Sequence, residues 1–138
     1  MILIHHDLQI ELLDEWWVAA GMKDFRLSGT AYRVDISANP NQTVYEVRIE
    51  DVVPVHRAQG VGIFNNDMET GLTAQERTVS ILQGFRSNAA FKPVEVKRLP
   101  STETHKYKLL DGTHRFYCSL AAGFTCVPAV VGFDWKTL

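Results

Sequence analysis

A run of polar residues at the start of an expected helix is the strongest chemical signal in the sequence. The stretch LLDGTHRFYCSLAAGF, residues 109–124, places an Asp-Gly pair before a helical run that opens with Thr113, His114 and Arg115. The first N–H groups of a helix have no partner within it and carry the positive end of its dipole, so they attract anions, most often phosphate. Gly112 leaves the backbone open to close approach, and Arg115 adds a planar cation that suits phosphate oxygens.

The other side chains of this turn leave more than one interpretation open. His114 adds a hydrogen-bond donor and Thr113 a hydroxyl, while Asp111 could hold the turn, orient His114 or bind a ribose hydroxyl. An ordinary structural interpretation also explains them: Thr113 caps the helix, Asp111 closes the turn and Arg115 forms a surface ion pair. Spacing alone favours neither interpretation. The turn is therefore a candidate phosphate site, with no catalytic residue assigned.

Further motifs carry less chemistry. Gly60 and Gly62 lack the third glycine of a dinucleotide-binding fingerprint, and no helix follows them at once. His5 and His6 are adjacent histidines without carboxylate or cysteine partners, so no metal site is expected there. Trp16 and Trp17 are expected at the core or its edge. The alternative is that they form an interface between copies of the chain, which would make it a homo-oligomer.

Composition indicates an ordinary globular domain. The chain has 138 residues, 46% of them hydrophobic, and a formal net charge of −2, so one domain over residues 1–138 is expected and DNA binding should be weak. Local basic groups occur only at residues 97–98 and 106–108. No apolar run is long enough for a membrane span. No signal peptide is visible, so Cys118 and Cys126 are expected to be buried thiols of a cytoplasmic protein, with a disulfide as the alternative. Their spacing, with no second pair, predicts no zinc site.

Periodicity predicts the elements that position these residues. Residues 7–22 have apolar residues at helical spacing and predict a helix. Residues 32–36 and 44–49 alternate around an NPNQ turn and predict a hairpin. An N-terminal extension over residues 1–40, made of this helix and the start of the hairpin, is therefore expected before the rest of the domain.

The second half predicts a helix, two strands, a helix and a final strand. Thr73 and Glu76 form a capping box before an apolar stripe. KPVEVKRL and HKYKLL predict neighbouring strands, THRFYCSLAAG a helix that Gly123 ends, and VPAVVGF the last strand. The predicted class is α+β, a mixed sheet with packed helices.

The segment YKLLDGTHRFYCSLAAGFTCVPAVV resembles the signature of the ParB/sulfiredoxin superfamily, which includes ParB-like N-terminal and ParB-like nuclease domains. That signature is a strand ending in Asp-Gly or Gly-Gly, a variable residue, His-Arg or Arg-Arg, a short helix, a glycine and Val-Pro before a strand. The resemblance covers about residues 44–133, and the first 40 residues have no counterpart. The matching positions are Asp111, Gly112, His114, Arg115, Ala121, Gly123, Val127 and Pro128.

The resemblance implies a ParB-like fold and a nucleotide, with magnesium, at the phosphate turn. It also places the loop over residues 54–71 near that turn, which makes His56 and Arg57 candidate contributors. Sulfiredoxins carry a reactive cysteine where this chain has Thr113, so that chemistry lacks its nucleophile. ParB proteins carry Gly-Glu-Arg-Arg where this chain has Gly-Thr-His-Arg, and the sequence leaves no room for their DNA-reading domain after the last strand.

Two functions follow as expectations. One is a phosphate- or nucleotide-binding domain that acts as a nucleotide-dependent enzyme or switch at the Asp-Gly-Thr-His-Arg turn. The other is a non-catalytic binding module associated with DNA maintenance or mobile elements. The family branches that resemble a kinase of free serine or a nuclease are not distinguished by these residues.

Overall fold

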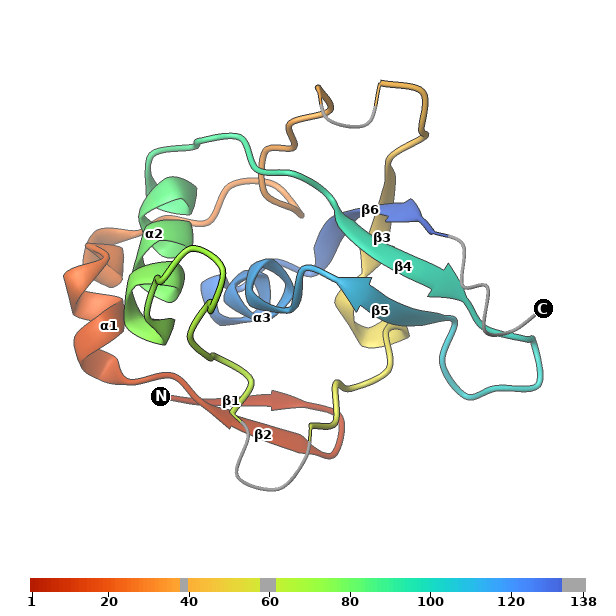
Figure 1. Ribbon diagram of the computed structural model, residues 1–138, viewed down its shortest axis with the longest axis horizontal. Coiled ribbons are helices and arrows are strands. Elements are labelled where there is room, and N and C mark those ends of the chain that lie inside the picture. Colours follow the sequence, from red (N-terminus) through yellow and green to blue (C-terminus); the bar gives the residue numbers. More distant parts are fainter. Residues whose placement is uncertain (38–39, 58–61, 133–138) are drawn as a thin grey trace.

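Two β-sheets and three α-helices make up the fold of residues 1–37, 40–57 and 62–132, which the computed structural model describes (Figure 1). The larger sheet has the strand order β3-β6-β4-β5, with β4 and β6 parallel and the other neighbours antiparallel. This mixed sheet with packed helices confirms the predicted α+β class. Its strands are β3 (Tyr45–Arg48), β4 (Val94–Arg98), β5 (Tyr107–Asp111) and β6 (Cys126–Val131).

The helices lie in succession beside this sheet. Figure 1 shows α1 (Asp14–Ala19), α2 (Ala74–Arg86) and α3 (Thr113–Ala122) one after another along the long axis, with the sheet beyond α3. One face of helix α3 is completely buried. Burial of large apolar side chains is the main term that stabilises such a core. The fully buried residues of α3 and of the sheet are Phe116, Tyr117, Cys118, Ser119, Val94, Val96, Val127 and Ala129.

The elements of the second half form as predicted. Thr73 accepts a hydrogen bond from the Glu76 N–H, and the Glu76 side chain accepts one from the Thr73 N–H, so the capping box starts α2. Gly123 ends α3 with a φ of 95°, a left-handed conformation that glycine adopts without strain. Local signals determine these boundaries.

The predicted helix over residues 7–22 is wrong in its N-terminal half and correct for Asp14–Ala19. Residues 2–11 form a two-stranded sheet, β1 (Ile2–His5) and β2 (Leu8–Glu11), and helix α1 begins only at Asp14. His6, in the two-residue turn between the strands, has a φ of 56°. Burial alternates along β1 as strand geometry requires, and the leucines of this segment fit that alternation as well as a helical stripe.

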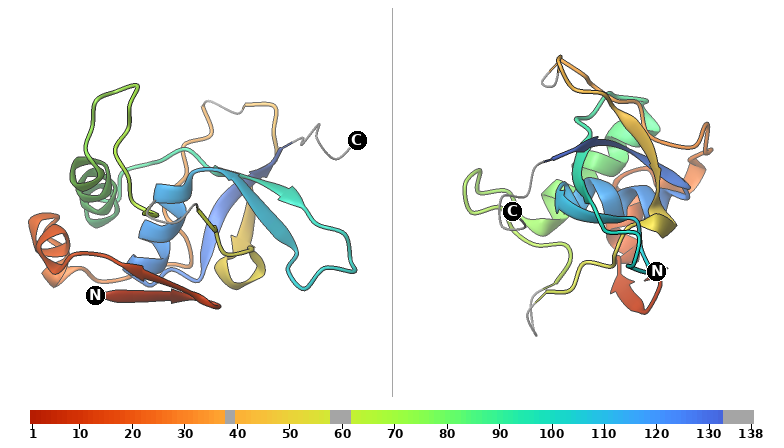
Figure 2. Two further views of the ribbon diagram at one scale, coloured as in Figure 1. Left: turned by 60° about the horizontal axis from the view of Figure 1, so that its bottom comes forward. Right: turned by 90° about the vertical axis from the view of Figure 1, so that its right-hand side faces the viewer.

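The β1–β2 hairpin packs on the rest of the fold through its buried side. Figure 2 shows it beside α3 and the 3-10 helix at Ile49–Asp51. Leu3 and Ile10 join the main hydrophobic core, and Trp16 and Trp17 of α1 are both half-buried against it. A single cluster therefore includes the N-terminal segment and the sheet.

The predicted hairpin between residues 32–36 and 44–49 is also wrong. β3 instead pairs antiparallel with β6, and the first segment contributes only a bridge between Val34 and Phe91. The Asp35 N–H donates to the Phe91 carbonyl, and the Phe91 N–H donates to the Arg33 carbonyl. Part of the expected turn, at residues 38–39, and Gly60 of the glycine loop lie outside the described residues.

Across the described residues, no helix has the length and apolar character needed to cross a membrane.

Candidate functional site: an arginine-lined pocket at the start of α3

The start of α3 is uncapped. Its first intrahelical bond runs from the Phe116 N–H to the Gly112 carbonyl at 2.9 Å, and no side chain caps the helix. The backbone N–H groups of Thr113, His114 and Arg115 thus have no acceptor within the described part of the chain. Helix α2, by contrast, satisfies its own start through the capping box. The uncapped start leaves three donors and the positive end of the dipole for an anion.

Gly112 is required by packing as well as by backbone conformation. Its φ is 97°, and a Cβ placed on it would lie 2.7 Å from Val94 Cγ1 and 3.0 Å from Arg115 Nη2. The missing side chain therefore makes room for strand β4 and for the arginine.

The change Gly112→Ala should lower the free energy of unfolding by about 2–4 kcal/mol, since a strained φ and an overpacked contact each cost about 1–3 kcal/mol. Urea denaturation measures this. Gly71→Ala is the matched control, because Gly71 also has a positive φ, of 76°, but nothing lies within 4 Å of its Cβ position. If the two variants lose equal stability, the Val94 contact is unimportant.

Arg115 is largely used within the fold. Its Nη1 donates to the Lys92 and Pro93 carbonyls at 3.0 and 3.3 Å, and its Nη2 lies 3.7 Å from Asp111 Oδ2. Its side chain is 18% exposed, whereas that of Asp111 is 77% exposed. Arg115 therefore ties the start of α3 to the segment before β4 and brings its charge to the pocket from that fixed position.

His114 anchors a loop. Its Nε2 accepts a hydrogen bond from the Asn65 N–H at 3.2 Å, and its ring lies edge-on to Phe64 at 5.7 Å. Burial, with a further contribution from Arg77, lowers the pKa of His114 to about 4. The imidazole is thus neutral near neutral pH, and its Nε2 is an acceptor. Nε2 therefore positions the Asn65 loop.

Arg77 of α2 is the residue that the sequence analysis missed. Its Nη1 donates to both the carbonyl and the side-chain oxygen of Asn65, each at 2.9 Å. It holds the same loop as His114 and reaches the pocket with Ser80 and Ile81 of its own helix. One sequence signal could have found it. Arg77 lies beside the apolar stripe of α2, three and four residues before Ser80 and Ile81, and residues at that spacing share one helix face.

These elements enclose a pocket of about 510 Å³. Arg57, Arg77 and Arg115 line it, against Asp111 as the one carboxylate among the described lining residues. Of the two loop candidates, Arg57 is brought to this pocket, whereas His56 lines a different cavity. The start of α3 forms one wall, and the apolar wall consists of Leu72, Ile81, Phe91 and Leu110.

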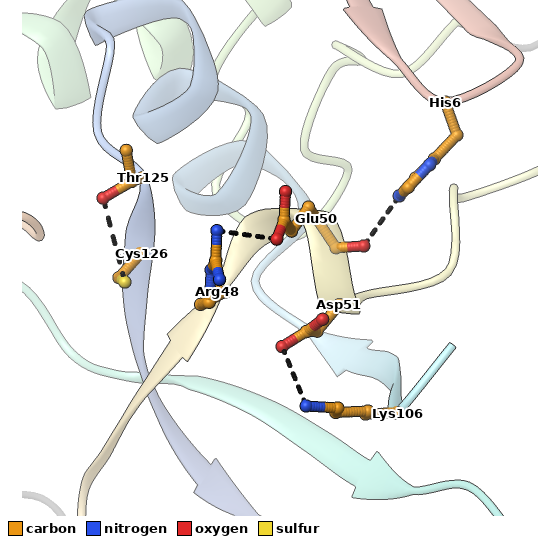
Figure 3. Close-up of polar contacts among 7 residues, drawn as sticks. All are labelled: His6, Arg48, Glu50, Asp51, Lys106, Thr125 and Cys126. Carbon is orange, nitrogen blue, oxygen red and sulfur yellow. Dashed lines mark hydrogen bonds and ion pairs between the residues drawn. The ribbon is translucent and has the colours of Figure 1, made fainter. Parts of the chain in front are cut away.

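Two carboxylates of the 3-10 helix at Ile49–Asp51 are paired with cations. Figure 3 shows Glu50 paired with Arg48 at 2.7 Å and Asp51 paired with Lys106 at 3.8 Å. Within the described ranges, no group of three His, Cys, Asp or Glu side chains is placed to hold a metal ion.

Both cysteines are free thiols. Cys118 is fully buried, and burial raises the pKa of its thiol, so it is a small core residue as predicted. Cys126 is only half-buried, because it lies at the start of β6.

Comparison of the chain with protein-family models, with curated proteins and with solved structures finds no match. The proposals below rest on the residues and their geometry.

Proposed function

We propose that the pocket at the start of α3 binds the phosphate group of a nucleotide or of another phosphorylated small molecule. One observation carries this proposal. The uncapped start of the ten-residue helix α3 faces a pocket to which α2 and the loop before it contribute Arg77 and Arg57. Three free N–H donors and a net positive lining are complementary to a phosphate, and the apolar wall suits the body that carries it.

The charge balance supports a ligand with more than one negative charge. Arg57 has no hydrogen-bond or ion-pair partner in the described ranges, and Arg77 uses only Nη1 in the bonds to Asn65. Asp111 is a single exposed carboxylate, the minimum that a phosphate-bound Mg²⁺ uses. Titrations with nucleotides should therefore be made with and without magnesium.

Binding is favoured over covalent catalysis at this pocket. The hydroxyls of Thr113 and Ser80 line it, but neither is hydrogen-bonded to a basic side chain in the described structure. A threonine or serine hydroxyl is a poor nucleophile unless an adjacent base activates it. The sulfiredoxin-like reaction is thus not proposed. A ParB-like nucleotide-binding module remains the proposed family relationship, on the motif at residues 111–115.

The change Arg57→Gln should weaken binding of inorganic phosphate and nucleoside triphosphates about tenfold or more, because a charge-assisted hydrogen bond contributes about 1.5–3 kcal/mol. Calorimetric titration measures the affinity. Arg57 is the best choice because it is exposed and has no hydrogen-bond or ion-pair partner in the described ranges. Arg98→Gln on β4 is the matched control, since it removes the same charge far from the pocket lining.

Two results would contradict the proposal. One is a wild-type protein that binds neither phosphate nor nucleotides at millimolar concentration. The other is an equal loss of affinity in Arg57→Gln and Arg98→Gln, which would indicate a general charge effect. A turnover assay on any nucleotide that binds then separates a binding module from an enzyme.

A further inference from the structure

A second cavity shares no lining residue with the phosphate pocket. It has a volume of about 330 Å³ and is enclosed by the segment after α1 and by the C-terminal end of α2. Its lining includes three arginines and four aromatic side chains, and none of its described lining residues is an aspartate or glutamate. The residues that matter here are Phe25, Arg26, Tyr32, Arg33, Phe85 and Arg86.

The floor of this cavity is a preformed aromatic cluster. Tyr32 stacks on Phe85 with ring centroids 5.5 Å apart and an interplanar angle of 17°, and Phe124 meets Phe85 edge-on at 5.5 Å. The Tyr32 hydroxyl donates to the Lys92 carbonyl at 2.5 Å, which fixes the ring. Tyr32, Phe85 and Phe124 are all buried, so the cavity ends on rings that the core holds in place.

The rim of the cavity carries uncompensated positive charge. Arg26, Arg33 and Arg86 are exposed and have no hydrogen-bond or ion-pair partner in the parts of the chain that the structure describes. Arg48 and Arg115, by contrast, are each held by a carboxylate or by carbonyls. Three guanidinium groups at one cavity repel each other, and an anion would relieve that repulsion.

The Arg86 side chain lies against the turn that follows α1. Its Cδ and Nε lie 3.2 and 3.3 Å from the position that a Cβ on Gly21 would occupy. Gly21 has a φ of 73°, so the turn after α1 presents bare backbone on which the Arg86 side chain rests.

We propose that this cavity is a second binding site, for a small aromatic molecule that bears a phosphate or carboxylate group. The rings of the floor take the aromatic body, since aromatic pairs prefer stacked or edge-to-face contacts. The three guanidinium groups of the rim take the anionic group, which they match in charge and in planar donor geometry. A volume of about 330 Å³ is at the small end of ligand pockets, which selects a single-ring ligand.

Two-dimensional NMR titration with phenyl phosphate and with benzoate tests the site, with inorganic phosphate and phenol as partial ligands. We expect phenyl phosphate and benzoate to shift the amide signals of residues 25–33 and 85–89 at millimolar concentration, and each partial ligand to bind more weakly. Arg33→Gln and Arg86→Gln should each weaken phenyl phosphate binding about tenfold, the factor for one charge-assisted hydrogen bond. Arg98→Gln, which removes the same charge on β4, should leave it unchanged.

The outcomes separate this site from the phosphate pocket. Shifts at residues 25–33 that persist in the Arg57→Gln variant support the second site whether or not the phosphate pocket binds anything. Shifts confined to residues 111–115, or none at millimolar concentration, would overturn it. Equal binding of phenol and phenyl phosphate would refute the role of the arginines, and equal binding of inorganic phosphate and phenyl phosphate would refute the role of the rings.

Discussion

Acidification from about pH 7 to about pH 4 should lower the free energy of unfolding by about 3 kcal/mol through His114 alone. The pKa of His114 is about 4 in the folded protein, against about 6.5 in an unfolded chain. Between these values the unfolded state binds more protons than the folded state, so stability rises with pH and is lost as the pH falls through this window. Each unit of pKa difference is worth about 1.4 kcal/mol.

His5 adds to the same trend. Burial lowers its pKa, and the nearby histidines His6 and His105 lower it further. Protonation of His114 also removes the acceptor for the Asn65 N–H, so acid should release the loop that Arg77 holds at the pocket. Loss of stability and loss of phosphate affinity should therefore occur together.

Urea denaturation at a series of pH values measures the effect, and His114→Gln isolates it. This variant should lose less stability than the wild type between about pH 6.5 and about pH 4, because it has no imidazole to protonate. His56→Gln is the control, since His56 is exposed and makes no hydrogen bond within the described residues. Parallel pH profiles for the wild type and His114→Gln would show that His114 is not the cause.

Tyr117→Phe should lower the free energy of unfolding by about 2–4 kcal/mol. The Tyr117 hydroxyl accepts a hydrogen bond from the Val55 N–H at 3.0 Å and lies 2.9 Å from Nδ1 of the buried His5, to which it donates. Nε2 of His5 in turn donates to the Ile49 carbonyl at 3.0 Å. Removing one oxygen leaves a donor and an acceptor without partners, and each unsatisfied buried group costs about 1–3 kcal/mol.

Tyr107→Phe is the matched control, because the Tyr107 hydroxyl has no partner in the described residues and the ring is only half-buried. Hydrogen exchange adds a second measurement. The amides of β1 and β2 should exchange faster in Tyr117→Phe, since the lost bond joins this hairpin to α3. If both variants keep wild-type stability, the buried network contributes little.

The N-terminal segment shows what local sequence patterns could not decide. Leu8 and Leu12 satisfy a helical stripe and a strand alternation equally, so periodicity alone could not choose between the two. The contacts of the β1–β2 hairpin are distant in sequence: His5 bonds to Tyr117 and to the Ile49 carbonyl. The helices from Thr73 onward were predictable because the signals that bound them, the Thr73–Glu76 capping box and Gly123, lie at the helix ends themselves.

The candidate site divides in the same way. The start of α3 at Thr113 follows from neighbouring residues, and the sequence predicted it. Whether Thr113 caps the helix was left open, and the structure shows no side-chain cap there. Arg77 and Asn65 approach it from another helix and another loop, so no local spacing links them to it. Arg115 and His114 line the pocket, but they also bond to carbonyl and N–H groups distant in sequence, and these contacts could not be predicted from local spacing.

The strand order also has a consequence for folding during synthesis. β6 lies between β3 and β4, so neither of them has this partner until residues 126–131 have left the ribosome. β3, at residues 45–48, thus waits for a strand almost 80 residues later, and long-range pairing of this kind slows folding. A nascent chain that is stalled before β6 should expose the unpaired edges of β3 and β4 and depend on chaperones to remain unaggregated.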